Sequence, residues 1–164
     1  METKKHFRNL IIYIIILVAI MGIIFYFSSE NSRSSNNSSG SFSKILLRII
    51  SPVFPSGVIE FIREYIRKIA HFTLYFTLGI FSVLTAKELF ILKNPEYKPY
   101  IRIYTSAFVF CIIYAASDEF HQYFVPGRSG KITDVLLDSI GSLSAILIIA
   151  ALTAIFHRHQ KSAT

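Results

Sequence analysis

The sequence predicts an all-α fold: an integral membrane bundle of four transmembrane helices, with an interfacial helix before the second. Hydrophobic residues make up 52% of the 164 residues and charged residues only 16%, which is too few to cover a water-soluble globule. Four long apolar stretches alternate with polar segments. Because backbone groups in lipid must be hydrogen-bonded internally, these stretches favour helices over an open sheet.

The first apolar stretch, residues 10–27, is 18 residues long and contains no charge. At about 1.5 Å per residue, such a helix crosses most of a hydrocarbon layer about 30 Å thick. A cleaved signal peptide is the alternative, but the apolar run is long and no clear Ala-x-Ala site follows it. We divide the chain into an N-terminal cytoplasmic tail with the first span (1–27), a flexible extracytoplasmic loop (28–56), a main domain (57–156) and a cytoplasmic C-terminal tail (157–164).

Three further apolar stretches follow, at residues 70–92, 100–116 and 135–156. The middle one is short and carries Arg102 at its start, so a re-entrant helix is the alternative there. Residues 28–41 are rich in Ser and Asn, which is typical of an exposed loop. From Ser56, isoleucines recur at helical spacing opposite charged residues, which predicts the interfacial helix.

The charges around the first span predict the orientation of the chain. Lys4, Lys5 and Arg8 precede this span and only Arg33 follows it closely, so the positive-inside rule puts the N-terminus in the cytoplasm. With four spans the C-terminus is cytoplasmic too. We expect a multi-pass protein of the cell membrane. The net charge is +7, but the basic residues are spread over the loops and do not form one patch. We therefore expect contacts with membrane lipids and none with nucleic acid.

Ionisable side chains gather at the ends of the second, third and fourth spans, which this topology places on the same outer side. Helical spacing puts polar residues of each span on a shared face, although Glu119 points about 100° away from Asp118, so the three faces can meet. An acid about one turn inside the membrane, such as Asp138, costs about 2.5–3.5 kcal/mol and is expected to face the bundle. The expected cluster consists of His71, Asp118, Glu119, His121, Arg128, Asp134 and Asp138.

If the cluster is catalytic, a histidine side chain is its candidate general base. His71 or His121 is a candidate general base because imidazole titrates near neutral pH, and Asp118 or Asp134 would orient it. These four are the predicted catalytic residues. The alternative is that the groups only pair with one another to fix helix register. The predicted substrate-binding residues, which include cations able to hold phosphate, are Arg67, Lys68, Tyr75, Glu119, Gln122, Arg128 and Asp138.

Other chemistries have weaker support. The single Cys111 excludes disulfides and cysteine-rich metal sites, and we expect no cofactor. Ser117 and Ser129 lie outside any G-x-S-x-G motif, so a serine nucleophile is disfavoured. A transporter is disfavoured because the four spans contain no internal repeat. A metal site stays an open alternative without a diagnostic spacing, its candidate ligands being His71, Asp118, Glu119, His121 and Asp134.

Two segments resemble the VanZ-like membrane proteins, a family named for a teicoplanin-resistance accessory protein of bacteria. They are RKIAHFTLYFTLG at residues 67–79 and SDEFHQYFVPGRSGKITDV at residues 117–135. The resemblance runs from about residue 67 to residue 145, and so leaves out the first span and the polar loop. It implies an integral membrane protein of the cell envelope that is linked to glycopeptide tolerance, without a settled biochemical activity.

We therefore predict an envelope protein whose polar extracytoplasmic site acts on a lipid-linked or cell-wall component and contributes to tolerance of teicoplanin-type glycopeptides. The alternative is a non-catalytic membrane protein that binds an envelope precursor or the antibiotic itself. The expected partners are membrane lipids and a lipid-linked cell-wall precursor or glycopeptide. Turnover and oligomeric state are left open by the sequence.

Overall fold

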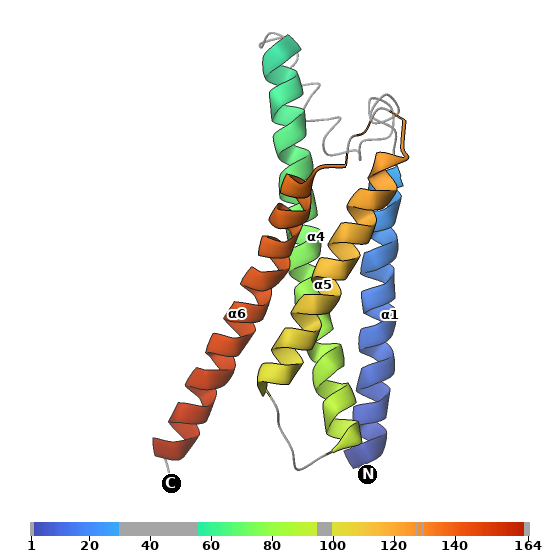
Figure 1. The fold of residues 1–164 in the computed structure, drawn as a ribbon. Helices are drawn as coiled ribbons and strands as arrows, with labels where there is room; N and C mark the ends of the chain where they lie inside the picture. Colours follow the sequence, from blue (N-terminus) through green and yellow to red (C-terminus); the bar gives the residue numbers. More distant parts are fainter. Residues whose placement is uncertain (1, 30–55, 95–99, 127, 129, 163–164) are drawn as a thin grey trace.

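The computed structural model describes residues 2–29, 56–94, 100–126, 128 and 130–162. These residues form four helices, α1 (Glu2–Ser29), α4 (Ser56–Lys93), α5 (Tyr100–Tyr123) and α6 (Ile132–Ser162). The helices run alternately up and down, so α1 begins and α6 ends at the same end of the bundle (Figure 1). Each contains a stretch long and apolar enough to cross a membrane. The all-α fold is confirmed, and the four long apolar helices are consistent with a four-span membrane bundle; α5, with 24 residues, is long enough to span.

Two predicted boundaries differ from the structure. The 38-residue α4 runs without a break through residues 56–69, so the interfacial helix does not form a separate element in the described part of the chain. The predicted loop began at residue 28, whereas Ser28 and Ser29 belong to α1 and Ser28 is completely buried. The rest of that predicted loop, residues 30–55, lies outside the described residues.

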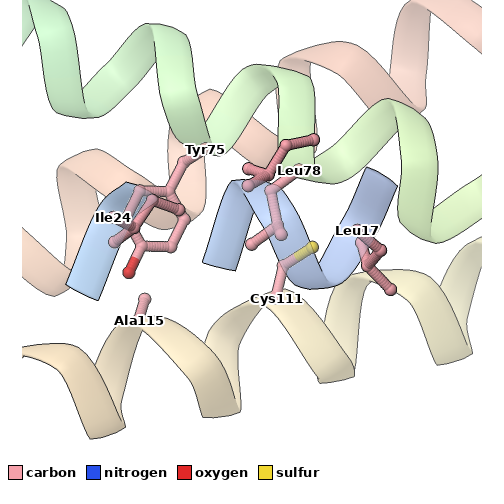
Figure 2. Close-up of a cluster of buried hydrophobic side chains, with 7 residues drawn as sticks. Leu17, Ile24, Tyr75, Leu78, Cys111 and Ala115 are labelled. Atoms are coloured by element: carbon pink, nitrogen blue, oxygen red, sulfur yellow. The ribbon is translucent and has the colours of Figure 1, made fainter. Parts of the chain in front are cut away.

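An apolar core lies between α1, α4 and α5. Figure 2 shows the Tyr75 ring from α4 lying beside Ile24 of α1, with its hydroxyl directed toward Ala115 of α5. Large apolar side chains also cover the outer surface of the bundle, where they suit contact with lipid, as at Ile15, Val18, Ile113 and Leu147. Because lipid tails are as apolar as these side chains, association of the helices depends on close packing and hydrogen bonds.

Two glycines, Gly79 and Gly141, bring the backbones of α4 and α6 close together. A methyl group on Gly79 would lie 2.7 Å from the backbone oxygen of Ser142, and one on Gly141 would lie 2.7 Å from that of Phe72. Real methyl carbons do not come this close to a backbone oxygen. These contacts therefore fix how far α6 is shifted along α4, and with it which polar side chains of the two helices meet.

Candidate functional site

Polar side chains from all four helices meet at one end of the bundle. This is the end where α1 ends and α6 begins (Figure 1). We call this the polar end. Its deepest charged groups are Asp118 and Asp138, which are only 3% and 1% exposed. Asp138 lies six residues inside α6, about 9 Å along the helix from its first residue. A carboxyl at that depth needs partners from the bundle, since lipid offers none.

His71 of α4 faces Asp138 of α6. Its Nδ1 atom lies 3.6 Å from Oδ2 of Asp138, and the two side chains are only 11% and 2% exposed. This distance is too long for a hydrogen bond but short enough for an ion pair when the imidazole is protonated. The acid opposite His71 is thus the one that the sequence analysis assigned to substrate binding, whereas Asp118 and Asp134 were the predicted orienting groups.

Asp118 of α5 is held from two sides. The Ser28 hydroxyl donates a hydrogen bond of 2.7 Å to Oδ2 of Asp118, and the Gln122 amide donates one of 3.1 Å to the same oxygen. Gln122 also donates to the Ser28 hydroxyl at 3.2 Å. The other carboxyl oxygen, Oδ1, has no hydrogen-bond partner among the residues that the structure describes. Ser28 therefore orients a site residue, a role that the sequence analysis missed.

A cavity of about 10 Å³ lies beside His71 and Asp138. This is room for about one water molecule. Its wall includes five further predicted site residues, so cationic, carboxylate and amide groups all reach it. They are Arg67, Lys68, Glu119, Gln122 and Asp134.

Glu119 also ties α5 to α6. Its Oε2 accepts a hydrogen bond of 3.0 Å from the backbone N–H of Lys131, just before α6 begins. A methyl group on the neighbouring Gly130 would lie 2.6 Å from the Glu119 backbone oxygen, so the connection packs tightly against α5. This contact helps to set the start of α6 at the polar end.

Four predicted site residues do not line this cavity: Asp118, described above, and three others. His121 faces α1: its Nε2 lies 3.2 Å from the Ser29 hydroxyl oxygen, and its ring stacks on Phe25 with 4.5 Å between centroids. Arg128 donates a hydrogen bond of 2.8 Å to the Phe27 backbone oxygen, a carbonyl in the last turn of α1. Tyr75 is fully buried in the apolar core.

Within the described residues, His71, Asp118 and Asp138 form a group of side chains that could hold a metal ion. One nitrogen or oxygen ligand atom from each lies within 4.8 Å of the other two. The metal alternative from the sequence named His71 and Asp118 but not Asp138. The remaining three candidates named there, Glu119, His121 and Asp134, are outside this group.

A second histidine–carboxylate pair lies at the opposite end of the bundle, and the sequence analysis did not identify it. Nδ1 of His6 lies 2.7 Å from Oε2 of Glu88, and Asn9 donates a longer hydrogen bond of 3.5 Å to Oε1. A cavity of about 550 Å³ borders this pair. The His6–Glu88 pair joins α1 to α4 far from the polar end, so substitutions in this pair are suitable controls for substitutions of His71.

A family profile described as VanZ/LLP1 matches residues 10–155. The match includes the first span, which the two sequence motifs left out, and the contact of Ser28 with Asp118 shows that this span contributes to the polar end. No curated protein and no solved structure shows a significant match. Because the profile covers most of its length, the chain belongs to the VanZ/LLP1 family.

Proposed function

We propose that the polar end faces the outside of the cell membrane and acts on an anionic, lipid-linked component of the cell envelope. The observation that carries this proposal is the meeting of His71, Asp118 and Asp138, from three helices. His71 and Asp138 border a water-sized cavity that Arg67 and Lys68 also line. Ionisable groups inside a membrane protein are costly and are mostly retained for function.

The residues around the cavity suit an anionic lipid headgroup. Arg67 is exposed and Lys68 half-buried, so their charges can reach a phosphate group at the membrane boundary. A water molecule in the cavity would lie beside an imidazole and carboxyl groups, which are the side chains that accept a proton in general base catalysis. We propose that a change in such an envelope component underlies a contribution to tolerance of teicoplanin-type glycopeptides.

The orientation belongs to the same proposal. The three basic residues before the first span favour a cytoplasmic N-terminus. Since α1 begins and α6 ends on one side of the bundle, the C-terminus is then cytoplasmic too and the polar end is extracytoplasmic. Residues 57–69, the first part of α4, would lie near the lipid headgroups on that side, as proposed for an interfacial segment.

A non-catalytic binder is the second candidate, favoured by the exposed aromatic side chains at the end of α5. Phe120, Tyr123 and Phe124 are between 65% and 70% exposed and lie next to the polar cluster. Aromatic rings at a membrane boundary can hold an amphipathic ligand such as a glycopeptide or an envelope precursor. Such a protein would change antibiotic binding without changing any envelope component.

One experiment separates these functions. A bacterial host would produce the wild-type chain, His71→Ala or His6→Ala at equal protein level, with His6→Ala as the control at the opposite end. Envelope lipids and lipid-linked precursors would be measured by mass spectrometry, and teicoplanin binding to cells with labelled antibiotic. We expect the wild type and His6→Ala to alter a phosphate-bearing component, and His71→Ala to lose this effect.

The other outcomes are equally informative. Unchanged composition with altered antibiotic binding that depends on His71 would support the binder instead. If neither measurement differs between cells with the wild-type chain and cells without it, or if His71→Ala behaves as the wild type, the proposed site is refuted.

A further inference from the structure

We propose that His71, Asp118 and Asp138 bind a divalent transition-metal ion of the Zn²⁺ or Mn²⁺ class. The inference concerns the same pocket as the proposed function, but it does not depend on which envelope component the pocket acts on. It rests on the spacing of the three donors, on two unpartnered buried oxygens and on the charge of the group.

The spacing of the donors suits one ion better than hydrogen bonding. Two ligands at about 2.0–2.2 Å from a tetrahedral zinc ion lie about 3.3–3.6 Å apart. The 3.6 Å between His71 Nδ1 and Asp138 Oδ2 falls at the edge of this range and is too long for a hydrogen bond. No distance within the group exceeds 4.8 Å, so about 1 Å of side-chain movement brings all three donors around one ion.

Two carboxyl oxygens in this group have no hydrogen-bond partner among the described residues: Oδ1 of Asp118 and Oδ2 of Asp138. Leaving such buried oxygens unpartnered is costly, and native structures rarely do so. If these side chains only paired with one another to fix helix register, the two oxygens would take part in the hydrogen bonds. Such pairing therefore does not explain why they are unpartnered. A bound cation would satisfy both.

The surroundings of Asp118 are those of a metal ligand. Ser28 and Gln122 both donate to Oδ2, and these bonds hold the carboxyl group in one orientation. Oδ1 is left available to a metal ion. Metal-binding carboxylates are commonly fixed by such hydrogen bonds from a second layer of residues. The arrangement also assigns a purpose to the complete burial of Ser28 at the end of α1.

Charge and donor type select the class of ion. Two carboxylates and a neutral imidazole carry a charge of about −2, which a divalent cation balances and a single proton does not. An imidazole with two carboxylates suits Zn²⁺ or Mn²⁺ better than Ca²⁺, which prefers oxygen alone. The adjacent cavity has room for about one water molecule as a further ligand.

The cations Arg67 and Lys68 line the same cavity, where they would repel a bare metal ion. An anionic group lying between them and the ion would balance both, as expected for a phosphate-bearing ligand. With an ion bound, His71 is a ligand, and the proton acceptor for the proposed function becomes a carboxylate of the cavity wall such as Asp134.

The test measures metal directly on the full-length protein in detergent. The protein is stripped with a chelator, dialysed against Zn²⁺ or Mn²⁺ alone, and its metal content is determined by mass spectrometry; affinity comes from competition with a metal-binding dye. We expect about one ion per wild-type chain, at least tenfold weaker binding in Asp118→Asn and Asp138→Asn, and unchanged binding in the control Glu88→Gln.

Folding is checked by gel filtration and by thermal unfolding without metal. Ser28→Ala keeps all three ligands and is the second variant if an aspartate variant does not fold; we expect its metal affinity to fall about tenfold or more. Addition of the ion should raise the unfolding temperature of the wild type, because the ion binds the folded state.

Two results would overturn the metal site: a folded wild-type chain that binds neither Zn²⁺ nor Mn²⁺, or metal binding in both aspartate variants that is as tight as in the wild type. The metal measurement and the envelope measurement fail independently. Metal binding without any effect on the envelope would refute only the proposed function, and an effect on the envelope without metal binding would refute only this inference.

Discussion

The hydrogen bond from Ser28 to Asp118 gives the sharpest prediction about stability. Ser28→Ala removes a donor at 2.7 Å from Oδ2 of a carboxyl group that is 3% exposed. It also removes the oxygen that accepts from Gln122 at 3.2 Å. A buried hydrogen bond to a charged group contributes about 1.5–3 kcal/mol, and Gln122 keeps its bond to Asp118. We expect the free energy of unfolding to fall by about 2 kcal/mol.

The neighbouring Ser29→Ala is the matched control. Ser29 is the last residue of α1. Its hydroxyl donates to the Phe25 backbone oxygen at 2.7 Å and lies 3.2 Å from Nε2 of His121, and both contacts are exposed. Exposed substitutions usually change stability by less than about 0.5 kcal/mol. Reversible unfolding of both variants in mixed micelles, followed by circular dichroism, gives the comparison. If Ser28→Ala costs no more than Ser29→Ala, the buried contact does not contribute as the structure indicates.

Three further predictions test the packing, the opposite end and the topology. Gly141→Ala should cost about 1–3 kcal/mol in micelle unfolding because its methyl group meets a backbone oxygen of α4, whereas Gly22→Ala, with nothing within 4 Å, should be neutral or stabilising; equal effects would contradict the close packing. Glu88→Gln should cost about 1–3 kcal/mol through its weakened bond to the α1 histidine, without loss of metal binding at the polar end. In a chain without the native cysteine, an impermeant maleimide should label Thr133→Cys on intact cells and Thr3→Cys only after permeabilisation; the reverse pattern would invert the orientation.

The four spans and the polar cluster were predictable because they depend on local sequence. Long apolar stretches define the spans, and spacing of three or four residues puts polar groups on one face of a helix. The structure brings His71, Asp118 and Asp138 together as a cluster of this kind requires. It also puts Arg67 and Lys68 on the wall of the adjacent cavity. The pattern does not determine how far each helix is rotated about its own axis. For this reason it could not show that His121 faces α1 and not the cavity.

The role of Ser28 could not be predicted for a different reason. It is the first polar residue after a long apolar run, and it is followed by a segment rich in Ser and Asn, so its composition matches that of a loop. Its partner Asp118 is 90 residues away in the chain. Burial of Ser28 follows only from the packing of α1 against α5, which no local spacing encodes.

The partner of His71 depends on the shift of α6 along α4. Asp134 and Asp138 are four residues apart on one face of α6, a separation of about 6 Å along the helix, so a shift of about one turn would exchange them. Gly141 sets this shift: it follows Asp138 by three residues and packs on the backbone of Phe72, the residue after His71. Because backbone contact at a glycine tolerates little sliding, the same contact that joins the helices also selects Asp138. Gly141→Ala should therefore weaken metal binding at His71 together with stability, whereas Gly22→Ala should weaken neither.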